Sequence, residues 1–238
     1  MSEGMITMND QQKLANATKI ISILLLMLIN QQMISQNIPM LRDSIKILSE
    51  QEHLITDLRR AELSDLASQI TALKADKGSA KVTFVCTHNS RRSQLAEIWL
   101  RTANRYLQIK DIDIYSGGTE ATAFNHRMVA ALQRFGFSLQ IAKQGNNPIY
   151  LDTEVEKKMF SKKYDAPYNP NQDFIAVMVC AQADRDCPFV PGAWARVSLP
   201  YLDPKVADDG PHEASAYDDK VKEIGREMLY LASQMQAN

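Results

Sequence analysis

The residues best suited to chemistry lie in one short polar loop between an apolar segment and a helical pattern. The loop runs from Cys86 through Thr87, His88, Asn89, Ser90, Arg91, Arg92 and Ser93. A cysteine thiolate is a strong nucleophile, and the backbone N–H groups of such a loop can bind an anion together with the N-terminus of the following helix.

Arg92 lies six residues after Cys86, far enough for its guanidinium to fold back and hold two oxygens of a tetrahedral oxyanion. Ser93 can donate to the sulfur, and all these groups lower the pKa of the thiol. The spacing therefore predicts a nucleophilic cysteine that acts on a bound oxyanion.

Two more cysteines lie later in the chain. Cys180 follows the apolar run of residues 174–179, and Cys187 comes seven residues after it, directly before Pro188. If the intervening segment were helical, the two Cα atoms would be about 10 Å apart, whereas a disulfide requires roughly 7 Å or less. The pair could bridge only if residues 181–186 unwind, which would couple oxidation to a conformational change. Two buried thiols without a redox role are the alternative.

Strands and helices are expected to alternate from residue 81 onwards. Strands are predicted at residues 81–85, 112–116, 174–179 and 195–199, and helices at residues 93–106, 125–134 and 216–235. This alternation is typical of an α/β fold with a small, mostly parallel sheet flanked by helices. In such sheets ligands bind at the carboxyl ends of the strands, which is where Cys86 lies. Residues 143–172, rich in Asn, Pro, Lys and Tyr, are expected to form an inserted loop region.

The N-terminal part of the chain has a different character. Residues 20–29 form an apolar run that is too short to span a bilayer, since a spanning helix needs about 20 apolar residues. The run is either an ordinary apolar helix in a cytoplasmic protein or the core of a signal peptide that would export it. Residues 36–76 show helical spacing of leucine and isoleucine, and Gly78 should end this helix. We therefore expect an apolar segment over residues 1–35, a helical extension with its linker over 36–80, and the domain that carries the loop over 81–238.

Composition excludes several functional classes. The formal net charge of −1 gives no electrostatic reason to expect a nucleic acid or an anionic membrane as partner. Three cysteines in 238 residues do not indicate a secreted disulfide scaffold, and no histidine stands at the spacing of a zinc site. The sequence implies no organic cofactor and no metal centre.

The segment C-T-H-N-S-R-R-S resembles the phosphate-binding loop of the low-molecular-weight protein tyrosine phosphatases and of the thioredoxin-coupled arsenate reductases that share their fold. Both families carry C-x-x-x-x-x-R-S after the first strand, and the resemblance covers roughly residues 81 to 235. It implies that Cys86 is the nucleophile, that Arg92 holds the oxyanion and that Asn89 braces the loop. His88 departs from the pattern, because the families often have glycine at this position.

The later cysteines resemble the arsenate reductase pattern, in which a C-x-x-x-x-x-x-C-P segment supplies two resolving thiols. This implies a relay in which Cys180 attacks Cys86, Cys187 attacks Cys180, and a thioredoxin-type dithiol reduces the resulting disulfide. In both families an Asp-Pro dipeptide after the last strand supplies a general acid, which corresponds to Asp203 here. The positions of Asn89, Glu97 and Ser116 match those that help to hold a potassium ion in some arsenate reductases; ordinary loop contacts are the alternative.

Two other functions remain open at this point. The first is a phosphatase that uses Cys86, Arg92 and Asp203 through a phosphocysteine. Against a phosphotyrosine substrate, Lys205 and Val206 follow the Asp-Pro dipeptide, where tyrosine phosphatases of this fold often carry an aromatic pair. The second is a non-catalytic oxyanion-binding or regulatory protein whose extension docks a partner.

Overall fold

The computed structural model describes residues 16, 18–22, 39–187 and 189–237. Most of the apolar N-terminal segment, and with it the signal-peptide question, lies outside the described residues. Within the described ranges, no helix combines the length and the apolar character needed to cross a membrane.

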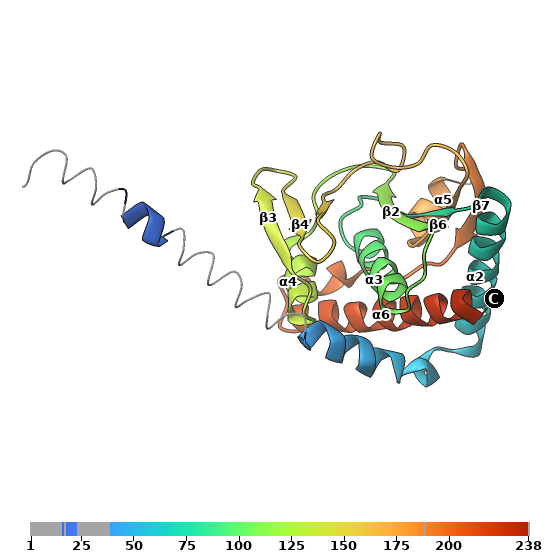
Figure 1. Cartoon of the computed structure of the whole chain (residues 1–238), viewed down its shortest axis with the longest axis horizontal. Helices are drawn as coiled ribbons and strands as arrows, with labels where there is room; N and C mark the ends of the chain where they lie inside the picture. Colours follow the sequence, from blue (N-terminus) through green and yellow to red (C-terminus); the bar gives the residue numbers. More distant parts are fainter. Residues whose placement is uncertain (1–15, 17, 23–38, 188, 238) are drawn as a thin grey trace, which may run out of the picture.

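A four-stranded parallel sheet forms the centre of the molecule (Figure 1). Its strands, in the order β2-β1-β6-β7, are β1 (Ala80–Cys86), β2 (Ile112–Gly118), β6 (Phe174–Met178) and β7 (Ala193–Ser198). Every pairing between neighbours is parallel, so β1, β2 and β6 end at one edge of the sheet. Every residue of β6 is buried, as the apolar run in the sequence predicts for a central strand. The predicted α/β architecture is confirmed.

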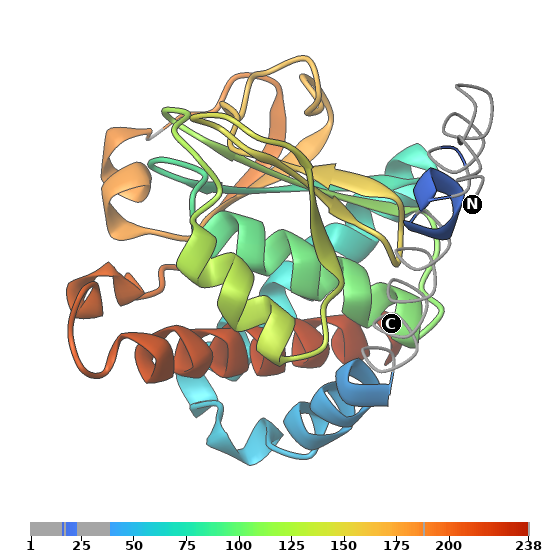
Figure 2. The same cartoon turned by 90° about the vertical axis from the view of Figure 1, so that its left-hand side faces the viewer.

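Three long helices cover one side of this sheet. They are α2 (Asp57–Lys77), α3 (Arg92–Tyr106) and α6 (Glu213–Ala237). Helix α3 packs on β1 and β2, and α2 packs on β1, β6 and β7, while α6 packs against both helices. Figure 2 shows α3 (green) beneath the sheet and α6 (red) beneath α3. Helix α2 thus completes the cover over the half of the sheet that α3 leaves open.

The predicted single helix over residues 36–76 is divided in the structure. A first helix spans residues 39–49, a 3-10 turn η1 covers Glu52–Leu54, and α2 starts after Thr56. The hydroxyl of Thr56 accepts from the backbone N–H of Arg59 at 3.3 Å, which makes Thr56 an N-cap and begins a new helix. The end at Lys77 agrees with the prediction, because Gly78 adopts the left-handed conformation with φ 78°.

The packing of α2 can be tested by truncating one of its buried side chains. Leu66 is fully buried in the core shared with the sheet. We expect Leu66→Ala to lower the free energy of unfolding in urea by about 2–5 kcal/mol, because it leaves a cavity. Leu58→Ala, at a position that is 73% exposed on the same helix, should change it by less than about 0.5 kcal/mol. Equal effects at the two positions would show that α2 does not belong to the core.

The inserted region contains more regular structure than its sequence indicates. Strands β3 (Leu139–Lys143), β4 (Ile149–Asp152) and β5 (Lys157–Met159) form a second, antiparallel sheet, which follows helix α4 (His126–Arg134). The expected loop at residues 143–172 is therefore wrong over β4 and β5. These strands are very short, and three residues such as Lys-Lys-Met carry no alternating pattern that a sequence reading could detect.

Two glycines bring this region against the end of β2. A Cβ on Gly117 would lie 2.3 Å from the Cα of Tyr164, and one on Gly118 would lie 2.7 Å from the backbone N of Asn89. The backbone of Gly118 also bonds to Lys162 and Tyr164. The close approach allowed by these glycines joins the inserted region to the loop after β1.

Candidate active site

Cys86 is the last residue of β1, and the loop after it leads directly into α3. Its sulfur lies 3.0 Å from the hydroxyl oxygen of Ser93 in the first turn of that helix. None of the backbone N–H groups of residues 87–91 donates a hydrogen bond to another described residue. Free backbone N–H groups at a helix N-terminus are suited to binding an anion.

Asn89 is part of the loop and adopts a left-handed conformation with φ 46°. Its side-chain NH₂ donates to Ser93 and to Ser116, each at 2.9 Å. Its Oδ1 accepts from the backbone N–H of Lys162 at 2.9 Å. These contacts tie the loop to α3, to β2 and to the inserted region, and asparagine tolerates the left-handed conformation better than most residues.

Arg92 and Asp203 meet at the mouth of the loop. Arg92 Nη2 donates to Asp203 Oδ2 at 2.6 Å, and Nη1 donates to the carbonyl oxygen of Tyr201 at 2.9 Å. A small pocket here is lined by Cys86, His88, Ser90, Arg91, Arg92 and Asp203. Arg92 Nε is buried and has no acceptor within the described part of the chain. The predicted nucleophile, clamp and acid therefore lie together, with a donor left over for an oxyanion.

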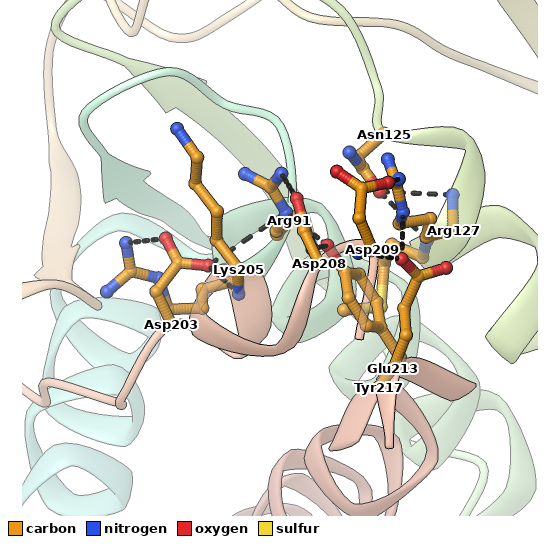
Figure 3. A network of polar contacts seen from close by, with 11 residues as sticks. Arg91, Asn125, Arg127, Asp203, Lys205, Asp208, Asp209, Glu213 and Tyr217 are labelled. Carbon is orange, nitrogen blue, oxygen red and sulfur yellow. Dashed lines mark hydrogen bonds and ion pairs between the residues drawn. The ribbon is translucent and has the colours of Figure 1, made fainter. Parts of the chain in front are cut away.

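Arg91 has a role that the sequence does not indicate (Figure 3). Its Nε donates to the hydroxyl of Tyr217 at 2.8 Å, and its Nη2 donates to Asp208 at 3.3 Å. The Tyr217 hydroxyl in turn donates to Asp208 at 2.7 Å, and burial together with this carboxylate raises the pKa of Tyr217 to about 12. Arg91 thereby joins the loop to α6 and to the segment after Asp203, rather than extending freely toward an anion.

Helix α2 also contacts the segment that precedes Asp203. Arg59 on α2 donates to the carbonyl of Pro200 at 2.8 Å and lies 5.0 Å from the centroid of the Tyr201 ring. Arg59 also pairs with the buried Glu227 at 3.5 Å, and Glu227 accepts from the Tyr201 hydroxyl at 2.7 Å. Since the Tyr201 carbonyl receives Arg92, the extension holds the backbone that positions Arg92.

The other two cysteines lie at opposite ends of a short helix, α5 (Ala181–Asp186). Cys180 is 1% exposed; its sulfur accepts from the backbone N–H of Ala183 at 3.3 Å and lies 3.5 Å from the Thr87 hydroxyl. Cys187 follows the last turn and is partly exposed. Within the described residues, none of the three cysteines is part of a disulfide. Because residues 181–186 are helical, Cys180 and Cys187 can form a disulfide only if α5 unwinds.

Comparison with known proteins assigns the family. The family model described as low molecular weight phosphotyrosine protein phosphatase matches residues 81–155. An arsenate reductase of Halalkalibacterium halodurans is 31% identical over 152 residues, which cover 63% of this chain and 94% of that protein. The arsenate reductase of Bacillus subtilis (strain 168) is 30% identical over 152 residues, with the same coverages of 63% and 94%.

The chain belongs to the arsenate reductase family of the low-molecular-weight phosphatase superfamily. Among solved structures, a low-molecular-weight phosphotyrosine phosphatase from Vibrio cholerae O395 matches with a TM-score of 0.47 at 18% identity, covering 66% of this chain and 97% of that one. The family model begins at β1, so Arg59 and the rest of α2 lie outside the matched residues.

The residues predicted to hold potassium lie next to the ammonium of Lys157. Asn89, Ser116 and Glu97 are connected, because the Ser116 hydroxyl accepts from Asn89 and donates to Glu97 Oε2 at 2.5 Å. Glu97 Oε1, however, lies 2.8 Å from Lys157 Nζ and 3.1 Å from Arg101 Nη1. The ammonium of Lys157 already supplies a monovalent positive charge to Glu97, and potassium binding stays a prediction.

Glu97 is fully buried, and its charge state affects stability. Burial would raise its pKa, but the charges of Lys157, Lys162 and Arg101 outweigh this effect and lower the pKa from 4.5 to about 2. Because the pKa in the folded state is the lower one, the carboxylate stabilises the fold above pH 4.5, and this stabilisation is lost as the pH falls toward 2.

Glu97→Gln is therefore expected to lower the free energy of unfolding at pH 7 by about 3 kcal/mol. The difference from the wild type should shrink when urea unfolding is repeated at pH 3. Glu50→Gln, at an exposed position in the turn that follows the first helix, serves as the matched control and should have little effect at either pH. A difference for Glu97→Gln that does not depend on pH would contradict the ionised state assigned to this carboxyl.

Proposed function

We propose that this chain reduces arsenate to arsenite through a relay of three thiols that a thioredoxin-type dithiol regenerates. The observation that carries the proposal is the placement of the cysteines. Cys86 lines the oxyanion pocket, while Cys180 follows the adjacent strand β6 and contacts Thr87 of the loop. Cys187 is partly exposed at the far end of α5. Relatives that are about 30% identical over 152 residues are named arsenate reductases, which supports the same chemistry.

In the first step, arsenate binds to the free N–H groups of the loop and to Arg92. The Cys86 thiolate attacks arsenic, a sulfur–arsenic bond forms, and one oxygen departs as water after Asp203 donates its proton. Arg92 already bonds to Asp203, so the acid lies next to the group that holds the oxyanion. Arsenic remains pentavalent in the thioester-like adduct.

In the second step, the Cys180 thiolate attacks the sulfur of Cys86. A Cys86–Cys180 disulfide forms, the sulfur–arsenic bond breaks, and its electron pair stays on arsenic, which leaves as arsenite. Two thiols have then been oxidised and arsenic has gained two electrons. Cys187 attacks Cys180 next, which frees Cys86 and forms Cys180–Cys187. This last bond requires α5 to unwind, because the helix holds its two ends too far apart.

The phosphatase alternative shares the first half of this chemistry. A phosphate ester would bind in the same loop, and water would hydrolyse the phosphocysteine without any role for Cys180 or Cys187. Beyond Asp203, the exposed residue at position 206 is valine, which is 94% exposed and offers no aromatic ring to a phosphotyrosine. This observation favours the reductase.

A paired assay distinguishes the two functions. Reduced full-length protein is supplied with thioredoxin, thioredoxin reductase and NADPH, and NADPH consumption is followed with and without arsenate. Hydrolysis of an aryl phosphate is measured under the same conditions. We expect arsenate-dependent NADPH consumption that greatly exceeds aryl-phosphate hydrolysis. The opposite ratio would identify a phosphatase, and phosphate binding without either activity would identify a regulatory oxyanion-binding protein.

A further inference from the structure

A second cavity lies beside the inserted region and is separate from the catalytic pocket. It has a volume of about 460 Å³, which is within the range of small-molecule sites. Three lysines and three aromatic rings line most of it: Lys157, Lys158, Lys162, Tyr115, Phe160 and Tyr168. None of these residues lines the catalytic pocket, whose walls come from the loop after β1 and from Asp203.

The charges around this cavity do not balance. Glu97 is paired with Lys157 and Arg101, and Arg101 is also paired with Asp152 at 2.7 Å. Together with Lys162 this cluster has three cations and two carboxylates. The remaining wall charges, on Lys158 and Glu156, are exposed and of opposite sign. One positive charge of the cluster is therefore left over.

That charge is located on Lys162. The residue is only 8% exposed, and within the described part of the chain its Nζ has no hydrogen-bond acceptor or ion-pair partner. The Nζ atom lies 5.2 Å from the centroid of the Phe160 ring. Burial lowers the pKa of Lys162, and the neighbouring Lys157 and Arg101 lower it further, against the opposing effect of Glu97. An ammonium that is buried and unpaired is costly unless a ligand supplies an anion.

The aromatic walls define the rest of the ligand. Phe160 and Tyr168 pack edge to face with centroids 5.1 Å apart, and Tyr168 is 68% exposed at the entrance. Tyr115 lies 5.0 Å below the ammonium of Lys157. Rings in these positions can stack on a flat aromatic group while the lysines bind a negative group at its end.

We propose that this cavity is a binding site for a small molecule that carries an oxyanion on an aromatic ring, with Lys162 as its principal anchor. The oxyanion pairs with the ammonium of Lys162, and the ring packs against Phe160 and Tyr168. The site is independent of the arsenate chemistry, and its occupancy requires no redox step.

Benzylphosphonate is a suitable probe, because it has both groups and is not hydrolysed. Calorimetric titration is done with the full-length chain carrying Arg92→Met, which removes the arginine clamp of the catalytic loop. We expect one molecule to bind per chain in this background. Adding Lys162→Met should weaken binding by about tenfold or more, the usual effect of losing a charge-assisted hydrogen bond. Lys158→Met, on the same cavity wall, should change binding by less than about twofold.

Three controls keep the test decisive. Inorganic phosphate and benzyl alcohol should each bind at least about tenfold more weakly than benzylphosphonate, because each has only half of the ligand. Benzylphosphonate should raise the thermal midpoint of Arg92→Met but not that of the double variant. Lys162→Gln, which keeps a polar end, should repeat the loss if Lys162→Met unfolds. Three results would each overturn the proposal. They are no binding of benzylphosphonate to Arg92→Met, an affinity for benzylphosphonate that does not change with Lys162→Met, and an affinity for inorganic phosphate equal to that for benzylphosphonate.

Discussion

A Cys86→Ser variant is expected to lose arsenate reduction by roughly 10⁴-fold or more, as happens when the attacking atom of a covalent mechanism is removed. A serine hydroxyl in the same loop has a pKa far above neutral, and in the described part of the chain no carboxylate or imidazole is hydrogen-bonded to the Cys86 sulfur. Ser93 lies at 3.0 Å from the sulfur and is itself a hydroxyl. Aryl-phosphate hydrolysis should fall with the reductase activity, since both reactions begin with attack by Cys86.

The control for Cys86→Ser is a measurement of phosphate binding, which does not depend on the reaction of the thiol. The loop N–H groups and Arg92 do not depend on the sulfur, so inorganic phosphate should still bind to Cys86→Ser in a calorimetric titration. Retained phosphate binding with no arsenite production assigns the loss to the nucleophile. Arsenite production within tenfold of the wild type would mean that Cys180 or Cys187 attacks arsenic, and would contradict the assignment of Cys86.

A Cys187→Ser variant is expected to complete one reduction and then stop. Cys86 and Cys180 remain, so one arsenite per chain should form, and a Cys86–Cys180 disulfide should accumulate. This disulfide lies at the buried end of α5, where Cys180 is 1% exposed, and a protein reductant reaches it poorly. Steady-state turnover with the dithiol should fall by about 100-fold or more.

Hydrolysis of an aryl phosphate is the internal control for Cys187→Ser, because a phosphocysteine needs no resolving thiol. It should be unchanged within about twofold. Cys180→Ser should fail at an earlier stage and release no arsenite. Unchanged arsenate turnover in Cys187→Ser would show that the relay ends at Cys180, and that the partial exposure of Cys187 has no catalytic purpose.

The catalytic loop is predictable because its chemistry is local. Cys86, Arg92 and Ser93 lie close together in the sequence, and the apolar run before them identifies β1. The parallel sheet follows for the same reason, since buried strands such as Phe174–Met178 are continuous apolar segments. Residues that act through distant partners carry no such signal. Arg59 contacts Pro200, and Arg91 contacts Tyr217, more than a hundred positions away in each case.

The helical extension shows the same limit. Its helical character is visible in the spacing of Leu63, Leu66, Ile70 and Leu73, and all four are fully buried. The spacing does not reveal what this apolar face packs against, because the strands of the sheet that it contacts come later in the chain. The break at Thr56 is equally hard to see, since an apolar spacing continues on both sides of it. The boundary proposed at residue 81 therefore separates α2 from the sheet whose core it shares.

A reaction without an external reductant tests the proposed thiol relay. Reduced wild-type protein is mixed with excess arsenate in the absence of any other reductant, and arsenite and free thiols are counted after the reaction stops. We expect one arsenite per chain, the loss of two thiols, and a Cys180–Cys187 disulfide in the peptide map, with Cys86 as the remaining thiol. No arsenite, with all three thiols intact, would contradict it.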